Sequence, residues 1–457
     1  MKTRHTRSKI FTATALVVSA ALALTGCGSG SVGSKNSIKV MYWSNSSAPD
    51  SDRLFKKVKA QMAKTHPDAE IELQAVAGSE EDYNTKVALA FRSPSTAPDV
   101  VYEDTMQVGA DVEAGYLLDI SKYVDKWDDW GHFIESTKKA VTYDGKVYGV
   151  PLSTDTRAIW YNKEVLEAAG VPTPWQPKSW NDILDMAAKV KAHDSGVIPF
   201  NMYAGTTVGE GAAISSFDLL LFGTELGDDA QYDAKSGKWV IGSSGFRDSL
   251  EFMKTLYDKG YGPSVSEALD TNLQKKMQSE WFPGGKMAAT VEGSWYPSSW
   301  AKGSSFEWNG HDSKMEVAAF PTQNGQEPGF VSMSGGWAVA VGSKSKNPKL
   351  AFDFVAQATN KENSMENYTN YTLDINPRAD VENDPNNQPD NKYVKSTTDL
   401  VQYTHFRPAY SAYSKVSAEL QKATEAVITG SQSVDEAAKA YDEAVTKIVG
   451  KDHVIKR

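Results

Sequence analysis

The stretch YDGKVYGVPLSTDTRAIWYNKEVLEAAGVPTP, residues 143–174, decides the fold. Asp144-Gly145 is a strong hairpin signal, because these residue types tolerate the positive φ angles of a two-residue turn. The apolar run at 159–161 predicts a strand, and Asn162 is placed to cap the helix that follows it. The polar segment 153–156 lies between these two patterns. The stretch therefore predicts a hairpin, then a strand, and then a capped helix.

Strand and helix patterns also alternate before this stretch. Residues 38–43 and 71–76 predict buried strands, and residues 98–102 begin a third. Between the first two strands, Leu54 and Val58 fall on one face at helical spacing. Such alternation is typical of βαβ units with a mainly parallel sheet, so we expect an α/β fold.

The size and charge of the chain limit its class. Its 457 residues are more than one hydrophobic core usually serves, so two lobes are expected. The formal net charge of -10 argues against a nucleic-acid partner. The segment 380–391 is rich in Asp and Asn, but the regular spacing of a calcium-binding EF-hand loop is absent. We therefore expect neither a metal site nor another cofactor.

Five motifs follow one another along the chain: APDVVYEDTMQVGADVEAGYLLDIS (97–121), the stretch at 143–174, FPGGKMAATVEGSWYPSSW (282–300), GGW (335–337) with NPKLAFDFV (347–355), and TGSQSVDEAAKAY (429–441). Taken in order, they resemble one known family, the extracellular solute-binding proteins of carbohydrate ABC importers, whose best-known members bind maltodextrins. Each motif alone is weak. Their joint order and spacing make the resemblance specific, and it covers nearly the whole chain after the leader.

The resemblance implies two α/β lobes, joined by a hinge of crossing strands, with a ligand cleft between them. The first lobe would comprise residues 38–153 and 338–376, and the second residues 157–334 and 380–457. It also implies a monomer that delivers its ligand to ABC permease subunits with their ATPase. The chain lacks the phosphate-binding G-x-x-x-x-G-K-[ST] loop, so it is not that ATPase itself.

An oligosaccharide is the ligand that the resemblance implies. Sugars present apolar C–H faces and a rim of hydroxyl groups, so their sites combine aromatic rings with a few polar side chains. In open α/β sheets these residues lie at the carboxyl ends of the strands. Four candidates follow the first three predicted strands: Trp43, Asn45, Glu80 and Asp104. The alternative for Trp43 is a packing role beneath the lobe.

The remaining candidates lie at the crossing or in the family motifs. Asp155 is in the polar segment 153–156, where a hinge hydrogen bond is its alternative role. Trp295 matches a family position that often stacks on sugar, and Trp337 follows two glycines that permit close backbone approach. The other four are Tyr203, Trp281, Arg378 and Arg407. An aromatic residue of the family's penultimate long helix is replaced here near Ser417.

The N-terminus predicts export. Basic residues, an apolar run from Ile10 to Leu24 and small residues before Cys27 make a secretory signal peptide. LTGC resembles a bacterial lipobox, in which the cysteine is acylated, for example with palmitate. We therefore expect a signal peptide at 1–26 and an acylated Cys27 that opens a Gly/Ser tether at 27–37. The chain would then sit on the outer face of the cell membrane of a Gram-positive bacterium.

Two other functions remain open for the sequence. A lipid-anchored glycan hydrolase would need two carboxyl groups on either side of the scissile bond, and Glu80, Asp104, Asp155 and Glu292 supply carboxyl groups. Nothing in the sequence marks a matched acid and base, so we expect a protein that is not an enzyme. A sugar sensor without a transport role would keep the same fold, because fold does not determine function.

Overall fold

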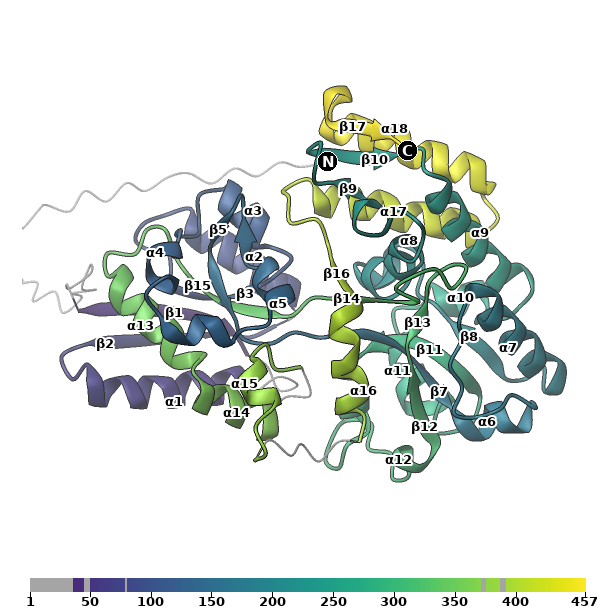
Figure 1. The fold of residues 1–457 in the computed structure, drawn as a ribbon, viewed down its shortest axis with the longest axis horizontal. Helices are drawn as coiled ribbons and strands as arrows, with labels where there is room; N and C mark the ends of the chain where they lie inside the picture. The colour runs from purple at the N-terminus through teal and green to yellow at the C-terminus, as the bar shows by residue number, and fades with distance from the viewer. Residues whose placement is uncertain (1–35, 45–49, 79, 371–374, 387–391) are drawn as a thin grey trace, which may run out of the picture.

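The computed structural model describes residues 36–44, 50–78, 80–370, 375–386 and 392–457. The predicted signal peptide at 1–26, Cys27, most of the tether at 27–37, and Asn45 lie outside the described residues, as does the side chain of Glu80. The described chain forms two α/β lobes that lie side by side and are joined by strands crossing between them (Figure 1). This confirms the predicted fold class.

The first lobe is built on a five-stranded sheet in the order β2-β1-β3-β15-β6. Its strands are β1 (Ser37–Trp43), β2 (Glu70–Val76), β3 (Val100–Asp104), β6 (Gly149–Pro151) and β15 (Trp337–Val341). β1 is parallel to β2 and β3, whereas β15 is antiparallel to both β3 and β6. The late strand β15 therefore completes a sheet whose other strands come from the first third of the chain.

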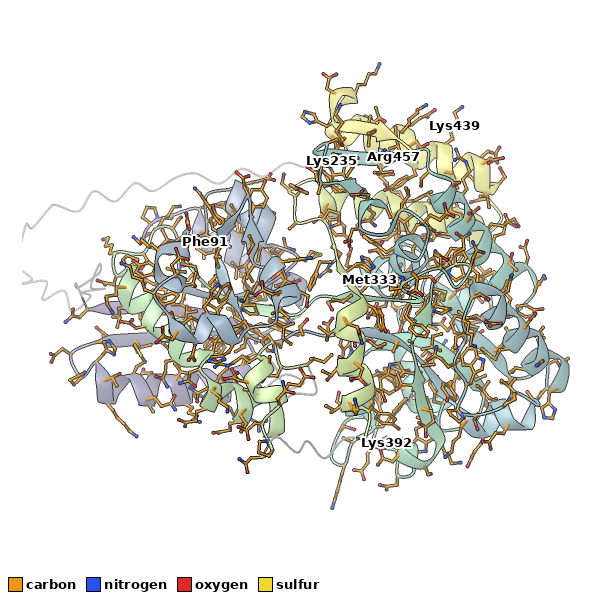
Figure 2. The ribbon with its side chains drawn as sticks, viewed as in Figure 1. Phe91, Lys235, Met333, Lys392, Lys439 and Arg457 are labelled. Atoms are coloured by element: carbon orange, nitrogen blue, oxygen red, sulfur yellow. The ribbon has the colours of Figure 1, made fainter. Side chains whose placement is uncertain are left out.

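Helices cover both faces of this sheet. Val40 packs on one face with Phe55 and Val355, and its neighbour Met41 packs on the other with Phe91, which Figure 2 labels inside this lobe. Successive strand residues point to opposite faces, so each face has its own apolar core. The helices are α1 (Asp50–Thr65), α2 (Glu80–Phe91), α3 (Val108–Glu113), α4 (Ser121–Val124), α5 (Glu135–Lys139), α13 (Pro348–Ala358), α14 (Lys361–Asn370) and α15 (Ala379–Glu382).

The second lobe contains a four-stranded sheet in the order β12-β7-β11-β8. Its strands are β7 (Arg157–Asn162), β8 (Ile198–Asn201), β11 (Met287–Gly293) and β12 (Met315–Ala318). Its helices are α6 (Lys163–Ala168), α7 (Trp180–His193), α8 (Asp218–Phe222), α9 (Ser244–Asp258), α10 (Val265–Ala268), α11 (Leu273–Lys276), α12 (His311–Lys314), α16 (Val394–Thr398), α17 (Tyr413–Ile428) and α18 (Val434–Val449).

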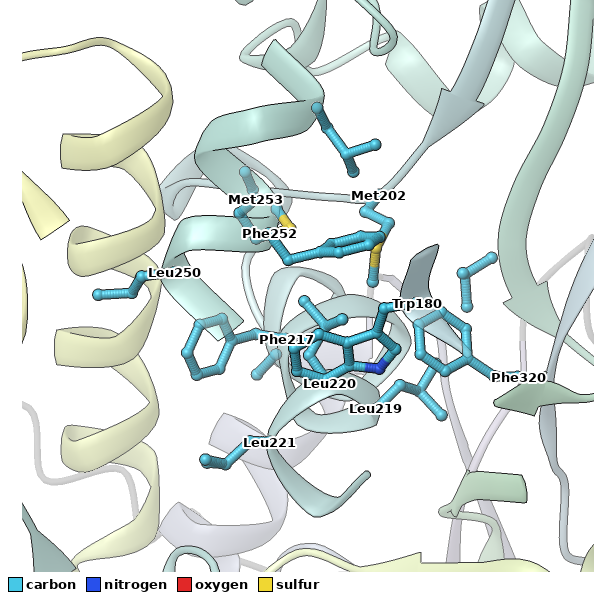
Figure 3. Packing of buried hydrophobic residues seen from close by; sticks show 14 of the residues in the cluster. Trp180, Met202, Phe217, Leu219, Leu220, Leu221, Leu250, Phe252, Met253 and Phe320 are labelled. Atoms are coloured by element: carbon cyan, nitrogen blue, oxygen red, sulfur yellow. The ribbon is translucent and has the colours of Figure 1, made fainter. Parts of the chain in front are cut away.

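Aromatic and aliphatic side chains fill the core of the second lobe. Trp180 lies against Phe252 with a centroid separation of 5.4 Å, and Phe217 and Leu220 pack close by (Figure 3). The predicted cap is present, because the Asn162 side chain accepts hydrogen bonds from the first backbone N–H groups of α6. The capping signal in the sequence and the packing of the core thus agree on where the helices of this lobe begin.

Two smaller sheets complete this lobe. One contains β13 (Phe320–Pro321), β14 (Phe330–Ser334) and β16 (Thr404–Phe406); the other contains β9 (Tyr232–Asp233), β10 (Lys238–Ile241) and β17 (Val454–Lys456). β17 is parallel to β10, and Arg457 forms an ion pair with Asp233. The last residues of the chain are therefore part of the fold.

The predicted hairpin lies just before the first crossing. It joins β4 (Thr142–Tyr143) to β5 (Lys146–Val147), with positive φ angles of 47° at Asp144 and 73° at Gly145. The first crossing then runs from β6 to β7 and the second from β14 to β15. The two crossings are bonded together, because the Trp337 N–H donates to the carbonyl of Ser153 at 3.2 Å.

Gly336 explains how the two crossings approach so closely. Its φ angle is +105°, and an added Cβ atom would lie 2.3 Å from the carbonyl oxygen of Ser153. Only glycine fits both the conformation and the space. The GGW motif therefore serves the hinge as well as the position of Trp337.

The return to the second lobe comes later than we expected. The predicted boundary was Asp380, but α15 packs on α14 in the first lobe, and Asp384 forms a 2.7 Å ion pair with Lys361 there. α16 is the next element that packs in the second lobe, where it lies beside β12. Residues 380–386 thus belong to the first lobe, because their charges are paired within it.

A buried and a half-buried carboxyl group lie together in the first lobe. Glu103 on β3 is 2% exposed and shares a hydrogen bond with Asp111 on α3. Burial raises the pKa of Glu103 well above its ordinary value and raises the pKa of Asp111 to about 6. A hydrogen bond between two carboxyl groups requires a proton on one of them, so this pair favours the protonated state.

Asp111→Asn should make stability less dependent on pH. A raised carboxyl pKa stabilises the fold fully below the pKa of the unfolded chain, and that stability is lost as pH rises through the folded value of about 6. The wild-type free energy of unfolding should therefore fall between about pH 4 and 7, relative to the variant, by up to about 1.4 kcal/mol per pH unit. Urea unfolding at a series of pH values measures this. Asp68→Asn, at an exposed position, is the control and should leave the profile unchanged.

Candidate functional site

Three aromatic rings stack at the carboxyl ends of β1 and β3. Trp337 lies 4.4 Å from Tyr102 with 16° between the ring planes, and 5.6 Å from Trp43 with 24° between them. The Trp43 indole N–H donates to the carbonyl of Gly78 at 3.0 Å, which fixes the outer ring. Trp43 and Trp337 are both half-buried. The first lobe thus carries rigid rings whose surface is only partly covered by protein.

Asp155 and Arg157 hold the crossing segment. Their side chains form an ion pair, and both are buried. The Asp155 carboxylate also accepts a hydrogen bond of 2.8 Å from the Gly335 N–H in the other crossing. The hinge hydrogen bond that was the alternative role of Asp155 is therefore present, and it lies where the lobes meet.

Arg407 joins the two lobes. Its guanidinium lies 3.8 Å from Asp104 at the end of β3 and 3.4 Å from Glu210 in the second lobe. The Trp337 residue is the cross-strand neighbour of Asp104, so this ion pair lies directly beside the stacked rings. We call the region where Asp104, Asp155, Arg157, Glu210 and Arg407 meet the junction.

Glu210 is the most connected junction residue that sequence reasoning missed. It accepts hydrogen bonds of 2.6 Å from both the Tyr413 hydroxyl and the Ser417 hydroxyl, in addition to the contact with Arg407. Ser417 is the position at which the resemblance lacks its aromatic residue, and here it anchors a carboxylate instead. The only local signal was the isolated acid in the Gly-Glu-Gly segment.

Trp295 lies on the second lobe, beside the junction. The Arg157 guanidinium lies 4.7 Å from the centroid of its ring, which is a cation–π distance. Gly293 lies beneath the same ring, and an added Cβ atom there would lie 2.1 Å from it. Trp295 is therefore held by a cation and a glycine, and it is half-buried like the rings of the first lobe.

Charge at the junction is balanced by pairing. Burial lowers the pKa of Arg407, but the carboxylates of Asp104 and Glu210 outweigh that effect and raise it above its ordinary value. Burial lowers the pKa of Arg157, and the Asp155 carboxylate compensates only in part. Burial, with the nearby Glu210, raises the pKa of Asp218 to about 8. The raised pKa favours the protonated form of Asp218, which limits the negative charge of the region.

Tyr203 and Trp281 lie behind this surface. Both are buried in an apolar cluster of the second lobe, and Trp281 is 7% exposed. The Tyr203 hydroxyl donates to Glu292, whose pKa is raised by burial although this bond acts to lower it. These two aromatic residues therefore support the lobe from within, rather than presenting their rings at the junction.

Arg378 was a candidate ligand residue, and the structure gives it another role. It is 1% exposed and lies in the first lobe, where it pairs with Asp129 at 2.7 Å and with Asp380 at 2.9 Å. Its Nη1 atom also donates to the carbonyl of Thr359 at 2.9 Å, and its guanidinium lies over the ring of Phe133. This side chain is held by its own lobe, so we assign it to folding.

Six of the predicted residues lie at the junction or beside it: Trp43, Asp104, Asp155, Trp295, Trp337 and Arg407.

In the described part of the chain, no three His, Cys, Asp or Glu side chains come close enough together to hold a metal ion. Among the same residues, no helix has both the length and the apolar character that a membrane span requires.

Comparison with known proteins identifies the family of the chain. The family model for bacterial extracellular solute-binding proteins matches residues 45–365. An arabinooligosaccharide-binding protein of Halalkalibacterium halodurans is 24% identical over 355 residues, which cover 75% of this chain and 72% of that one. A maltodextrin-binding protein of Bacillus subtilis is 25% identical over 62% of this chain and 61% of its own length.

A solved structure shows the same fold. The cyclic alpha-maltosyl-1,6-maltose binding protein of Arthrobacter globiformis superposes with a TM-score of 0.73 at 21% sequence identity. The match covers 90% of this chain and 98% of that one. At this identity the likeness shows that both chains share the two-lobed fold.

Arg378→Ala should destabilise the protein. It removes a buried cation that pairs with two half-buried carboxylates and bonds to a backbone carbonyl, so we expect the free energy of unfolding to fall by about 1–3 kcal/mol. Chemical denaturation measures this loss. Arg92→Ala removes an exposed cation from the same lobe and should change stability by less than about 0.5 kcal/mol. Equal stability of wild type and Arg378→Ala would contradict the folding role.

Proposed function

Because this chain belongs to the family of bacterial extracellular solute-binding proteins, we propose that it binds an oligosaccharide between its two lobes and delivers it to an ABC permease. The observation that carries the proposal is the set of half-buried tryptophans on both sides of a junction of paired charges. Rings stack on the apolar faces of sugars, and charged side chains bond to the hydroxyl groups. The names of the relatives, which bind arabinooligosaccharides and maltodextrins, support a sugar ligand.

Each lobe contributes part of the proposed site. Trp43 and Trp337 supply rings from the first lobe, and Trp295 supplies a ring from the second. Asp104 and Glu210 come from different lobes but share the cation of Arg407. A ligand that contacts both sets of rings would hold the lobes together, so closing and binding would be coupled. Asn45 and Glu80, by their positions after β1 and β2, complete the proposal for the first lobe.

The proposed role is that of a receptor and not of an enzyme. The carboxyl groups of the junction are engaged, since Asp155 bonds to the crossing, Glu210 bonds to α17 and Asp104 pairs with Arg407. A hydrolase needs one carboxyl group free as an acid and another free as a base or nucleophile. Incubation with oligosaccharides, followed by a search for shorter products, separates the two functions.

Calorimetric titration with a panel of oligosaccharides tests the proposal. The variant Trp295→Ala tests whether this ring contacts the sugar. Loss of the ring should weaken binding of the preferred sugar by about 1–3 kcal/mol, on the scale of other buried aromatic contacts. Trp130→Ala is the matched control, because that half-buried ring packs on Phe133, within the first lobe and outside the junction. It should bind as the wild type does. No binding by any panel member would refute the proposed function.

We also propose that Cys27 anchors the protein to the outer face of the cell membrane through a lipid. The LTGC motif and the Gly/Ser segment after it support this role. Cys27→Ala should release the protein from the membrane fraction into the medium, because the acylated residue is lost. Immunoblotting of both fractions measures the release, and the sugar affinity should stay unchanged. A variant that remains with the membrane would contradict the anchor.

A further inference from the structure

The chain enters the first lobe at the side that faces away from the second lobe (Figure 1). β1 and β3 begin at this side, and β15, which is antiparallel to β3, ends there. Ser37 is the first residue of β1, and its carbonyl accepts a hydrogen bond of 2.8 Å from the Asn347 side chain. The start of the fold is therefore bonded to the segment that follows β15.

Four cations lie around this entry point: Lys39 on β1, Arg92 after α2, and Lys344 and Lys346 after β15. We call these four residues the basic edge. The ammonium group of Lys344 donates to the carbonyl oxygen of Phe91, which brings the end of α2 to the same place. Among the residues that the structure describes, none of the four forms an ion pair with a carboxylate. Their charges are therefore available to an anion outside the fold.

The nearby acids do not neutralise the basic edge. The Asp99 carboxylate is engaged by the fold, since it accepts hydrogen bonds from the Lys39 N–H at 2.9 Å and from the Ser345 hydroxyl at 2.5 Å. Asp68 and Glu70 lie at the start of β2, which is the outermost strand, on the far side of β1 from β3 and β15. In a chain of net charge -10, this edge thus collects cations on one side of β1.

The proposed lipid anchor would keep this edge close to the membrane. The chain advances nine residues from Cys27 to Asn36, and each residue spans at most about 3.6 Å, so the reach is about 30 Å. A short tether raises the effective concentration of the edge at the lipid surface. Charges attract each other there over about 8 Å at physiological ionic strength. Cations at the root of the tether are therefore the ones best placed to meet lipid headgroups.

We propose that the basic edge binds the phosphate groups of an anionic lipid surface, so that the first lobe rests on the membrane by this side. The inference rests on the proposed lipid anchor. β1 runs from the basic edge to Trp43, over about 20 Å at the usual rise of a strand. The half-buried rings of the first lobe then point away from the membrane, and the proposed sugar site opens toward the surroundings of the cell.

Lysine labelling of the acylated full chain on vesicles tests the inference. The vesicles contain either phosphatidylglycerol with phosphatidylcholine or phosphatidylcholine alone, and mass spectrometry reads the labelled lysines. On the anionic vesicles, labelling of Lys39, Lys344 and Lys346 should fall about threefold or more, because one basic residue favours an anionic surface by about fivefold. Lys235 and Lys439, which Figure 2 labels on the second lobe, should react equally on both kinds of vesicle.

Equal labelling of the three lysines on both kinds of vesicle would overturn the inference, because the tether alone brings the edge near either surface. The double variant Arg92→Gln/Lys346→Gln removes two exposed cations and should reduce the protection of Lys39 and Lys344. The matched control Lys235→Gln/Lys439→Gln removes two cations from the second lobe and should keep that protection. Protection that is unchanged in Arg92→Gln/Lys346→Gln would also overturn the inference.

Flotation of the vesicles tests the lipid anchor separately. If the chain floats with neither kind of vesicle, the proposed anchor fails. The same labelling is then repeated with the free chain and phosphatidylglycerol vesicles at low salt, where charge attraction acts over a longer distance. Protection of the three lysines would support the basic edge without the anchor, and its absence would overturn the inference.

Discussion

The ion pair of Asp155 and Arg157 is the constraint on which the rest of the structure depends. It is buried where the chain first passes between the lobes, and its carboxylate also takes the N–H of Gly335 from the returning crossing. Removing either charge would leave the other buried without its partner, which is costly in a site of low dielectric. One interaction therefore fixes both crossings, and with them the position of each lobe's sheet.

The same interaction lies beneath the surface that we propose for sugar binding. Arg157 extends from the ion pair to the ring of Trp295, while Gly335 is followed by Gly336 and the stacked Trp337. The rings of the two lobes are therefore attached to the two ends of one buried network. In the proposed function, a ligand that displaced either ring would therefore also disturb the hinge.

The sequence allowed the framework to be predicted because its signals are local. Strand ends placed Trp43 and Asp104 at one edge of the first sheet, and the GGW motif marked Trp337, which the structure brings beside them. Glu210 could not be found in this way, since its partners Tyr413 and Ser417 lie 203 and 207 residues further along the chain. Arg378 was misassigned for the same reason, because its partner Asp129 is 249 residues away. Pairings of this kind depend on tertiary structure.

The strand order also determines when each lobe can finish folding. β15 lies between β3 and β6, so the first sheet stays open until residues near position 341 are available. β17 pairs with β10, so this small sheet of the second lobe cannot form until residues 454–456 are available. Contacts between such distant segments form slowly. Each lobe is therefore completed only after segments that lie far apart in the chain have met.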